Sequence, residues 1–424
     1  MPQLVHIVGA GLAGLSAATD LAAKGYPVSL YEATAQAGGR CRSYFDEHLG
    51  RTIDNGNHMM LSGNRSLMAY LSRIESRNKL VHTKSSRFEF YDFSSRKRWC
   101  LDFGSGMIPL ALLNKANRLP GSSLRDYLDI LKTRQAPRGQ SVEACLSGGN
   151  EDNPSPLYEE LWHPLATAIL NTDPDEAQAA MLWPVIKQAF ARGGSSVRPM
   201  IAMNELGGLS AALITPALEF LERRLANIQY QQRLVSIDQE RGEISALNFT
   251  STSVTVESGE QVIFAMPPWA LTDVLGDIDG LKVPTEYRPI INGHFVLPSE
   301  INKITIIGLT NSLSQWVFAH GDMASVTISA AGPHMDLSNE EIAAQMWPEI
   351  LSALGMEDAP LGPYRIIREK RATIAHTPEQ MSKRPYCRIA RMKNLILAGD
   401  WTNTGLPATI EGAIYSGWLA ASAV

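Results

Sequence analysis

The chain has 424 residues, of which 45% are hydrophobic and 19% charged, and its formal net charge is −5. This length exceeds the size at which single hydrophobic cores stop growing, so we expect two domains. The acidic balance argues against a nucleic-acid partner. The four cysteines lie far apart without a C-x-x-C pair, which favours reduced thiols in a cytoplasmic protein over disulfides or a zinc site.

The first forty residues predict a βαβ nucleotide-binding unit. Apolar runs at 4–8 and 28–32 indicate buried strands, and an Ala/Leu-rich stretch at 15–24 indicates the helix between them. Gly9, Gly11 and Gly14 have the G-x-G-x-x-G spacing, which gives a tight turn, backbone approach to a pyrophosphate and close helix packing. Glu32, at the end of the second strand, would accept hydrogen bonds from ribose hydroxyls. The alternative is a glycine-rich turn that serves only packing.

The residues directly after this unit favour FAD over NAD. Ala37-Gly38-Gly39-Arg40 resembles the second fingerprint of FAD oxidoreductases related to amine oxidases and phytoene desaturases. In that group the Gly-Gly pair lets the backbone run beside the flavin diphosphate, and the resemblance implies that Arg40 supplies positive charge there. The alternative is that Arg40 is a surface residue after a turn.

Residues 51–60 predict a short strand that runs into a glycine turn. In the resembling flavoproteins a D-x-G-x-H segment brings the chain beside the isoalloxazine ring. Asp54 and His58 would then orient the backbone near the flavin. His58 is a candidate proton donor, and bound water is the alternative. Otherwise Asp54 caps a turn and His58 is a core histidine.

Residues 61–204 predict helices at 66–74, 157–170 and 178–191 and a hairpin at 87–101. The segment 107–140 differs from the rest, because it carries six basic and two acidic residues in a chain of net charge −5. It opens with an apolar helix expected at 107–119. This combination favours contact with an anionic bilayer surface; the alternative is an ordinary amphipathic helix with a solvated basic face. No run of 18 apolar residues free of charges or breakers predicts a membrane-spanning helix.

The rest of the chain returns to the nucleotide fold twice. Residues 207–224 predict a helix, and strands follow at 253–257 and 261–265; in related flavoproteins the segment at Leu234 and Val235 packs on the adenine. Residues 279–387 form the second part of the other domain, with strands expected at 290–297, 303–309, 316–320, 324–330 and 364–370, and a helix at 339–354. Residues 395–417 predict a buried strand, a loop and a helix beginning near Thr409. The helix would direct its positive end at the flavin.

These elements predict an α/β, Rossmann-like FAD-binding domain with an interleaved α+β substrate domain. The FAD-binding domain is discontinuous and comprises 1–60, 205–278 and 388–424. The substrate domain comprises 61–204 and 279–387.

Over its whole length the chain resembles the phytoene desaturase and amine oxidase superfamily, and within it the hydroxysqualene dehydroxylase family of squalene-associated FAD-dependent desaturases. The resemblance is carried by Ile53-Asp-Asn-Gly-Asn-His58 and by the segment 399–413, which is similar to G-D-W-T-x-T-G-L-P-A-T-x-E-G-A. The FAD-binding residues that this reading implies are Gly9, Gly11, Leu12, Ala13, Gly14, Glu32, Gly39, Arg40, Gly56, Asn57, His58, Met59, Val235, Gly399, Asp400, Thr409, Ile410 and Ala413.

The resemblance also implies a reaction and its partners. In that family hydroxysqualene, a long-chain isoprenoid, is reduced to squalene and water in bacterial squalene and hopanoid biosynthesis. Because the chain has one dinucleotide fingerprint, a separate electron donor would reduce the flavin. We expect a cytoplasmic protein, peripheral on the inner face of the cytoplasmic membrane. The alternatives are a carotenoid-type desaturase, an amine oxidase with Trp401 and Tyr415 as cage candidates, and a flavin-binding scaffold or lipid carrier without turnover.

Overall fold

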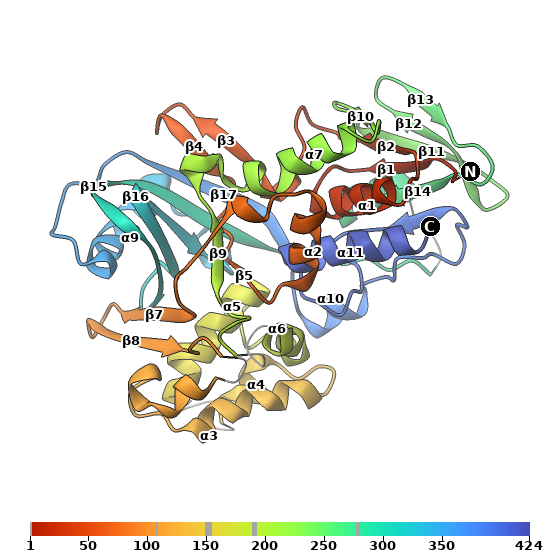
Figure 1. Ribbon diagram of the computed structural model, residues 1–424. Helices are drawn as coiled ribbons and strands as arrows, with labels where there is room; N and C mark the ends of the chain where they lie inside the picture. Colours follow the sequence, from red (N-terminus) through yellow and green to blue (C-terminus); the bar gives the residue numbers. More distant parts are fainter. Residues whose placement is uncertain (1, 107–108, 149–154, 189–192, 277–279) are drawn as a thin grey trace.

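The computed structural model describes residues 2–106, 109–148, 155–188, 193–276 and 280–424. Two sheets lie side by side, and both chain ends lie beside the sheet drawn on the right of Figure 1. Short helices gather below the other sheet. Among the described residues, no helix has the length and apolar character needed to cross a bilayer.

The right-hand sheet has five parallel strands built from distant parts of the chain. Their spatial order is β10 (Asn227–Gln229), β2 (Val28–Tyr31), β1 (Val5–Val8), β14 (Gln261–Phe264) and β18 (Leu395–Leu397). Ile7 lies in register between Leu30 and Ile263, and all three are fully buried in one core. Val8 and Phe264 belong to the core on the opposite face. The sheet is therefore covered on both sides, as its continuously apolar strands require.

Helices cover one face of this sheet and an antiparallel sheet covers the other. The helices are α1 (Leu12–Ala23), α7 (Thr215–Glu222) and α11 (Ile410–Ser422), and the covering strands are β11 (Leu234–Glu240), β12 (Glu243–Phe249) and β13 (Ser253–Thr255). α1 and α11 pack closely, because the Ser16 hydroxyl donates to the Ile414 carbonyl at 2.8 Å. A Cβ at Gly417 would lie 2.1 Å from the Ala13 carbonyl oxygen, so this approach requires glycine.

The left-hand sheet is mixed and contains two long strands. Its order is β16 (Trp316–Ile328), β15 (Tyr287–Thr310), β7 (Arg87–Asp92) and β8 (Lys97–Asp102), with β17 (Tyr364–Ile374) also paired to β15. Helix α9 (Asn339–Leu354) packs on one face, where Phe295 and Ile307 are buried. Phe90 and Trp99 belong to the core on the other side, which includes residues of α4 (Val142–Leu146), α5 (His163–Leu170) and α6 (Leu182–Gln188).

Several further strands and α-helices of the described chain are short. They are β3 (Ser43–Asp46) paired with β4 (Arg51–Asp54), the sheet of β5 (Met60–Leu61), β9 (Pro199–Ala202) and β6 (Leu80–His82), and the helices α2 (Arg65–Arg73), α8 (Pro268–Leu275) and α10 (Pro378–Ser382). Glu411 of α11 accepts hydrogen bonds from the amides of Ser66 and Leu67, at the start of α2, at 2.9 Å each. This carboxylate therefore fixes α2 on α11.

The helix expected at 107–119 was wrong. Its described residues form two short 3₁₀ turns, η3 (Leu110–Leu113) and η4 (Lys115–Asn117), and the Asn114 side chain accepts from the Ala116 amide between them. Residues 107 and 108 lie outside the described residues. The chain continues through α3 (Leu124–Tyr127) and the 3₁₀ segment η5 (Leu128–Gln135).

The strand boundaries in the second domain were also wrong. The strands expected at 290–297 and 303–309 form the single strand β15, and those expected at 316–320 and 324–330 merge into β16. The β15–β16 ladder shifts register between Val296 and Thr305 instead of ending. The helix expected at 178–191 begins as a 3₁₀ turn and becomes α6, and residues 189–191 lie outside the described part of the chain.

Candidate active site

The nucleotide turn leaves room in front of α1. Gly11 is the N-cap residue of α1 and no side chain caps this helix, and a Cβ at Gly11 would meet nothing within 4 Å. By contrast, Gly9 has a φ of +105°, and a Cβ at Gly14 would lie 1.9 Å from the Gly9 carbonyl oxygen. The uncapped N–H groups of Leu12 and Ala13 therefore face a site that an anionic diphosphate fits.

Glu32 retains acceptor capacity for ribose hydroxyls. Its carboxylate accepts from the Ala10 amide and from the Thr34 amide, each at 2.9 Å. The Thr34 hydroxyl also donates to Oε1, at 2.9 Å. A carboxylate has about four lone-pair sites, so Oε2, which accepts from the Ala10 amide, can accept a further hydrogen bond. The Gln232 amide donates to the Glu32 carbonyl, and three residues later Val235 is 54% exposed. An apolar side chain is therefore available near the end of β2 for an adenine ring.

Arg40 connects the two ends of the chain. Its Nη2 lies 2.8 Å from Oδ1 of Asp400, and its Nη1 donates to the Ala372 carbonyl at 2.6 Å. Gly38 and Gly39 have φ values of +113° and +55°. Burial disfavours the charge, but the Asp400 carboxylate outweighs it and raises the pKa of Arg40. Arg40 is thus a cation held in place beside the turn at Gly38 and Gly39. Its pairing with Asp400 was not predicted from the sequence.

The start of α11 is held rigidly at the other end of the site. Thr409 caps the helix by accepting from the Gly412 amide at 3.1 Å, and the Ala413 amide bonds within the helix. Before it, Nε2 of His376 accepts from the Ala408 amide at 2.9 Å. Burial, with the nearby Arg384, lowers the pKa of His376 to about 3, so it stays a neutral acceptor. The positive end of α11 is therefore fixed in orientation.

Asp54 anchors the loop that precedes His58. Its carboxylate accepts from the Ser43 hydroxyl at 2.6 Å and from the Leu209 amide at 2.9 Å, and burial raises its pKa to about 6. Its carbonyl bonds Nε2 of His294 at 3.0 Å, while Nδ1 of His294 bonds the Ser325 hydroxyl at 2.8 Å. These contacts place the loop against β15 and β16.

His58 lies next to a small cavity in a form unsuited to giving a proton. Its Nδ1 is 2.8 Å from the Gly56 carbonyl, so this nitrogen carries the hydrogen and Nε2 is the acceptor. Burial lowers the pKa of His58, and the charge of Arg40 acts in the same direction against the Gly56 hydrogen bond. The neutral imidazole is therefore favoured.

The same cavity, of about 60 Å³, is also lined by a histidine–carboxylate contact that was not predicted from the sequence. Its lining includes Asn57, His58, Glu205 and His320. Nδ1 of His320 lies 3.2 Å from Oε1 of Glu205. A cavity of this size has room for a few water molecules. No sequence signal pairs two residues 115 positions apart.

The cage suggested for an amine substrate is absent at Trp401 and Tyr415. Trp401 is 2% exposed, and its indole N–H donates to the Met266 carbonyl at 3.0 Å. Tyr415 stacks on Trp418 of the same helix, with ring centroids 5.7 Å apart. In the described chain no cluster of His, Cys, Asp or Glu could hold a metal ion.

Comparison with known proteins identifies the family of the chain. The family model for flavin-containing amine oxidoreductases matches residues 12–424. A hydroxysqualene dehydroxylase of Sinorhizobium fredii is 41% identical over 99% of this chain and 98% of its own, and one of Rhodopseudomonas palustris is 40% identical over 100% and 99%. The crystal structure of an oxidoreductase from Methanosarcina mazei superposes with a TM-score of 0.71 at 15% identity, covering 98% of this chain and 99% of that one.

The structural neighbour supports the fold, which is the α/β FAD-binding type with a substrate domain that the sequence predicted. The family match confirms the prediction that FAD is the cofactor of an oxidoreductase. The near-full-length identity to the two curated relatives confirms the predicted family. The chain belongs to the flavin-containing amine oxidoreductases and, within them, to the hydroxysqualene dehydroxylases.

Proposed function

We propose that this protein converts hydroxysqualene to squalene by FAD-dependent reductive dehydroxylation, in bacterial squalene and hopanoid biosynthesis. The observation that carries the proposal is the 41% identity to a hydroxysqualene dehydroxylase over 99% of the chain. In this reaction the substrate hydroxyl takes up a proton and leaves as water, and a hydride takes its place on the same carbon. The hydride brings two electrons, so each turnover needs a separate donor to restore reduced flavin.

We propose that the chain contacts the cofactor along its whole length. When bound and reduced, FAD supplies the hydride. The α1 amides would hold the diphosphate, Glu32 the ribose hydroxyls, and Val235 the adenine, while Arg40 adds positive charge. The remaining proposed contacts are Gly9, Gly11, Leu12, Ala13, Gly14, Gly39, Gly56, Asn57, His58, Met59, Gly399, Asp400, Thr409, Ile410 and Ala413.

We propose the Glu205–His320 pair, in place of His58, as the source of the proton. The hydroxyl of hydroxysqualene is allylic, so its protonation and loss as water leave a delocalised cation. His58 donates its Nδ1 hydrogen to Gly56 and holds no second proton when neutral. The Glu205–His320 pair lines the same small cavity as Asn57 and His58, which are proposed to contact FAD, and water in this cavity would carry the proton from the pair.

Replacing either member of this pair tests the proton source. We expect Glu205→Gln and His320→Asn to slow single-turnover dehydroxylation by roughly 10²- to 10⁴-fold, because general-acid catalysis typically contributes that much. His58→Asn should cost far less and should leave the pH profile unchanged. Flavin absorbance verifies that each variant retains FAD. If His58→Asn has the large effect and the other two have none, His58 is the donor.

An anaerobic single-turnover experiment tests the function itself. The bound flavin is reduced with dithionite, excess reductant is removed, and detergent-dispersed hydroxysqualene is added. We expect flavin reoxidation that matches squalene formed. Absence of reoxidation would contradict reductive dehydroxylation, and the oxidised protein would then be offered phytoene-like lipids and amines. Retention of FAD without any redox change would instead indicate a scaffold.

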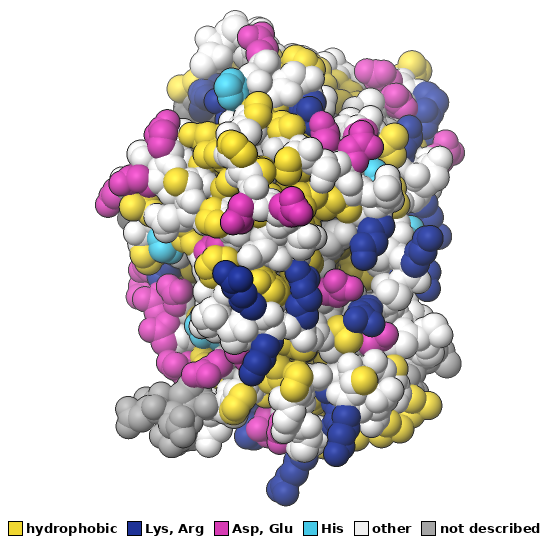
Figure 2. Space-filling model, turned by 90° about the vertical axis from the view of Figure 1, so that its left-hand side faces the viewer, with side chains coloured by type: hydrophobic (Ala, Val, Ile, Leu, Met, Phe, Trp, Pro, Cys, Tyr) yellow, Lys and Arg dark blue, Asp and Glu magenta, His cyan; other side chains and the backbone are white. Residues whose placement is uncertain are grey.

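We also propose peripheral contact with the inner face of the cytoplasmic membrane through residues 109–135. Although the expected helix is absent, its turns still expose apolar side chains: Leu110, Leu113, Leu124, Leu128 and Leu131 are 63%, 63%, 38%, 60% and 49% exposed. Lys115, Arg125 and Lys132 lie on the same segment. Figure 2 shows Lys and Arg side chains gathered on the lower half of one face, with hydrophobic side chains between them. Such a surface suits an anionic bilayer.

A further inference from the structure

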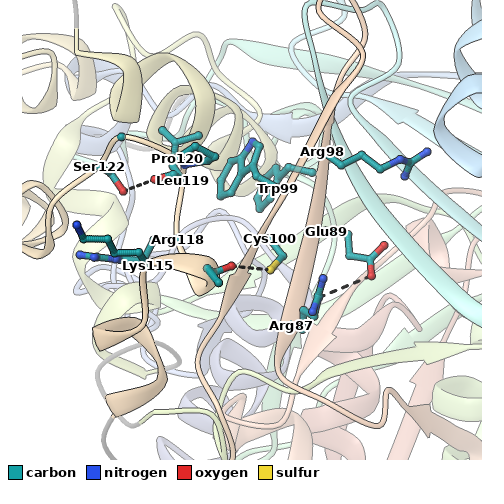
Figure 3. A pocket seen from close by; sticks show the side chains of 13 residues that line it. Arg87, Glu89, Arg98, Trp99, Cys100, Lys115, Arg118, Leu119, Pro120 and Ser122 are labelled. Carbon is teal, nitrogen blue, oxygen red and sulfur yellow. Dashed lines mark hydrogen bonds and ion pairs between the residues drawn. The ribbon is translucent and has the colours of Figure 1, made fainter.

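A cavity of about 800 Å³ lies between the β7–β8 hairpin and the turn at 115–122 (Figure 3). It lies apart from the proposed FAD contacts and shares no residue with them. Its charged lining comprises Arg87, Glu89, Arg98, Lys115 and Arg118. Four cations against one carboxylate make it unsuited to a hydrocarbon chain, so we infer that it is not the squalene site.

The four cationic side chains of this cavity differ in the contacts that they make. Arg98 reaches away from the cavity in Figure 3, donates to the Ala353 carbonyl at 2.7 Å and lies 4.7 Å from the Tyr91 ring centroid. Arg87 has a loose contact with Glu89 at 3.8 Å. Lys115 and Arg118 have no ion-pair partner among the described residues, and Figure 3 draws both side chains on the turn at 115–122. These two are the cations available to a ligand.

Arg118 is the strongest indication that something binds here. Arg118 is 5% exposed, yet its Nε has no hydrogen-bond partner within the described chain. The indole N–H of Trp99, which also lines the cavity, lacks an acceptor in the same described residues. Buried guanidinium and indole donors are normally satisfied. A ligand with several anionic oxygens would satisfy Arg118, because phosphate accepts paired hydrogen bonds from a guanidinium.

The surroundings indicate which phosphate would reach this cavity. Leu110 and Leu113, both 63% exposed, directly precede Lys115, and Leu124 follows Ser122 at the other end of the lining segment. Apolar side chains that enter a bilayer would bring lipid phosphates to the mouth of the cavity. We propose that the cavity is a binding site for the phosphate headgroup of an anionic phospholipid. This inference rests on the proposed membrane contact and goes beyond it by naming a pocket and its ligand.

Vesicle binding by the FAD-loaded protein tests the proposal. Flotation is measured with phosphatidylcholine vesicles and with vesicles that also contain phosphatidylglycerol. The variants are Arg118→Gln and Lys115→Gln; the control is Arg241→Gln, which removes an exposed arginine from the β11–β12 turn. We expect affinity for the anionic vesicles to fall about fivefold for Lys115→Gln and about tenfold for Arg118→Gln, with Arg241→Gln unchanged. Lys115 is exposed, so its replacement should not disturb folding. Lys115→Gln therefore still tests the binding site if Arg118→Gln unfolds.

Free ligands distinguish a lipid headgroup from other phosphates. Short-chain, micelle-free phosphatidylglycerol should raise the thermal midpoint of the wild type and not of Arg118→Gln. Stabilisation by inorganic phosphate or diphosphate without an effect of the lipid would overturn the lipid assignment, as would equal vesicle binding by all three variants. The single-turnover assay with dispersed substrate is run on the same samples. Its failure would remove the proposed reaction, whereas a vesicle result of either sign would leave that reaction unaffected.

Discussion

Gly11 and Gly14 lie three residues apart in the nucleotide turn, but different physical constraints require a glycine at each. Nothing lies within 4 Å of a Cβ at Gly11, so the protein itself leaves that space free. A Cβ at Gly14 would collide with the Gly9 backbone. The first glycine therefore serves the ligand, and the second serves the contact of helix and strand.

Alanine at each position should separate these two roles. Gly11→Ala should lose FAD while the unfolding free energy of the apo-protein changes by no more than about 1 kcal/mol. Gly14→Ala should lower that free energy by about 1–3 kcal/mol through overpacking. Flavin absorbance and urea unfolding of the apo-proteins measure both effects. Full FAD retention by Gly11→Ala would contradict the role of this turn in diphosphate binding.

The buried histidines predict a loss of stability in mild acid. Burial lowers the pKa of His294 to about 4 and that of His376 to about 3. Below the unfolded value of about 6.5, the unfolded chain binds protons that the folded chain refuses, so stability falls as the pH drops from 6.5 toward 4 and then 3. Asp54 acts oppositely: its raised pKa, about 6, makes folding gain stability as the pH drops from 6 to 3.8.

Removing one of these histidines should make the unfolding free energy depend less on pH. We expect the unfolding free energy of His294→Gln to depend less on pH between 6.5 and 4, by about 3 kcal/mol over that interval. The measurement is urea unfolding at a series of pH values, compared with the wild type. An unchanged slope would mean that His294 does not stay neutral in the folded protein.

At the scale of elements, local patterns could be predicted and distant pairings could not. The opening βαβ unit and the α11 start were predictable because apolar runs, glycines and Thr409 act within a few residues. The helix at 107–119 failed because Asn114 bonds the Ala116 amide and starts a new turn. The long strand β15 was divided because polar residues follow Pro298, although the pairing with β16 continues beyond them.

The candidate site divides in the same way. The cofactor residues near the turn follow from spacing, and their FAD contacts stay predictions. The Arg40–Asp400 pair joins residues 360 positions apart and arises when β18 joins the parallel sheet. The Glu205–His320 pair joins residues 115 positions apart and arises when the two sets of segments assemble. A single sequence gives no physical signal for such pairs.

Glu411 allows the packing of helices to be tested, because its carboxylate accepts hydrogen bonds from three donors outside α11. It accepts from the Ser66 and Leu67 amides and from the Gln188 side chain. Glu411→Gln turns one acceptor into a donor and should lower the unfolding free energy by about 1–3 kcal/mol. The control is Glu340→Gln on the exposed first turn of α9, which should change it by less than about 0.5 kcal/mol. Chemical unfolding measures both changes. Equal changes in unfolding free energy for the two variants would contradict the role of Glu411 in holding α2 on α11.

At the scale of the molecule, the two sheets are built from different segments of the chain. The five parallel strands all lie within 1–60, 205–278 and 388–424, and the long mixed sheet lies within 61–204 and 279–387. This distribution supports the proposed domain division, although residues 277–279 at one boundary lie outside the described chain. The surface formed by residues 109–135, with its exposed leucines and basic side chains, belongs to the segments 61–204 and 279–387. It lies on the side of β7 and β8.

The leucines on that surface should govern membrane affinity without affecting the chemistry. Leu110→Ser/Leu113→Ser should weaken binding to anionic vesicles by roughly tenfold or more, because each inserted leucine side chain contributes up to about 1.5–3 kcal/mol. Turnover of detergent-dispersed hydroxysqualene should stay at the wild-type rate. Flotation and single-turnover assays measure the two quantities. Unchanged flotation would exclude this surface as the membrane contact.

The origin of the parallel sheet in distant segments also affects how the protein can be made. β1 and α1 are synthesised long before the elements they contact, because β14, which pairs with β1, begins at Gln261 and α11, which packs on α1, begins at Ile410. At roughly 5–20 residues per second, the apolar surface of α1 waits about 20–80 seconds for its partner. Contacts of such sequence separation also slow folding. FAD loading is therefore expected to follow synthesis of α11, and a nascent chain that lacks α11 should bind chaperones instead of cofactor.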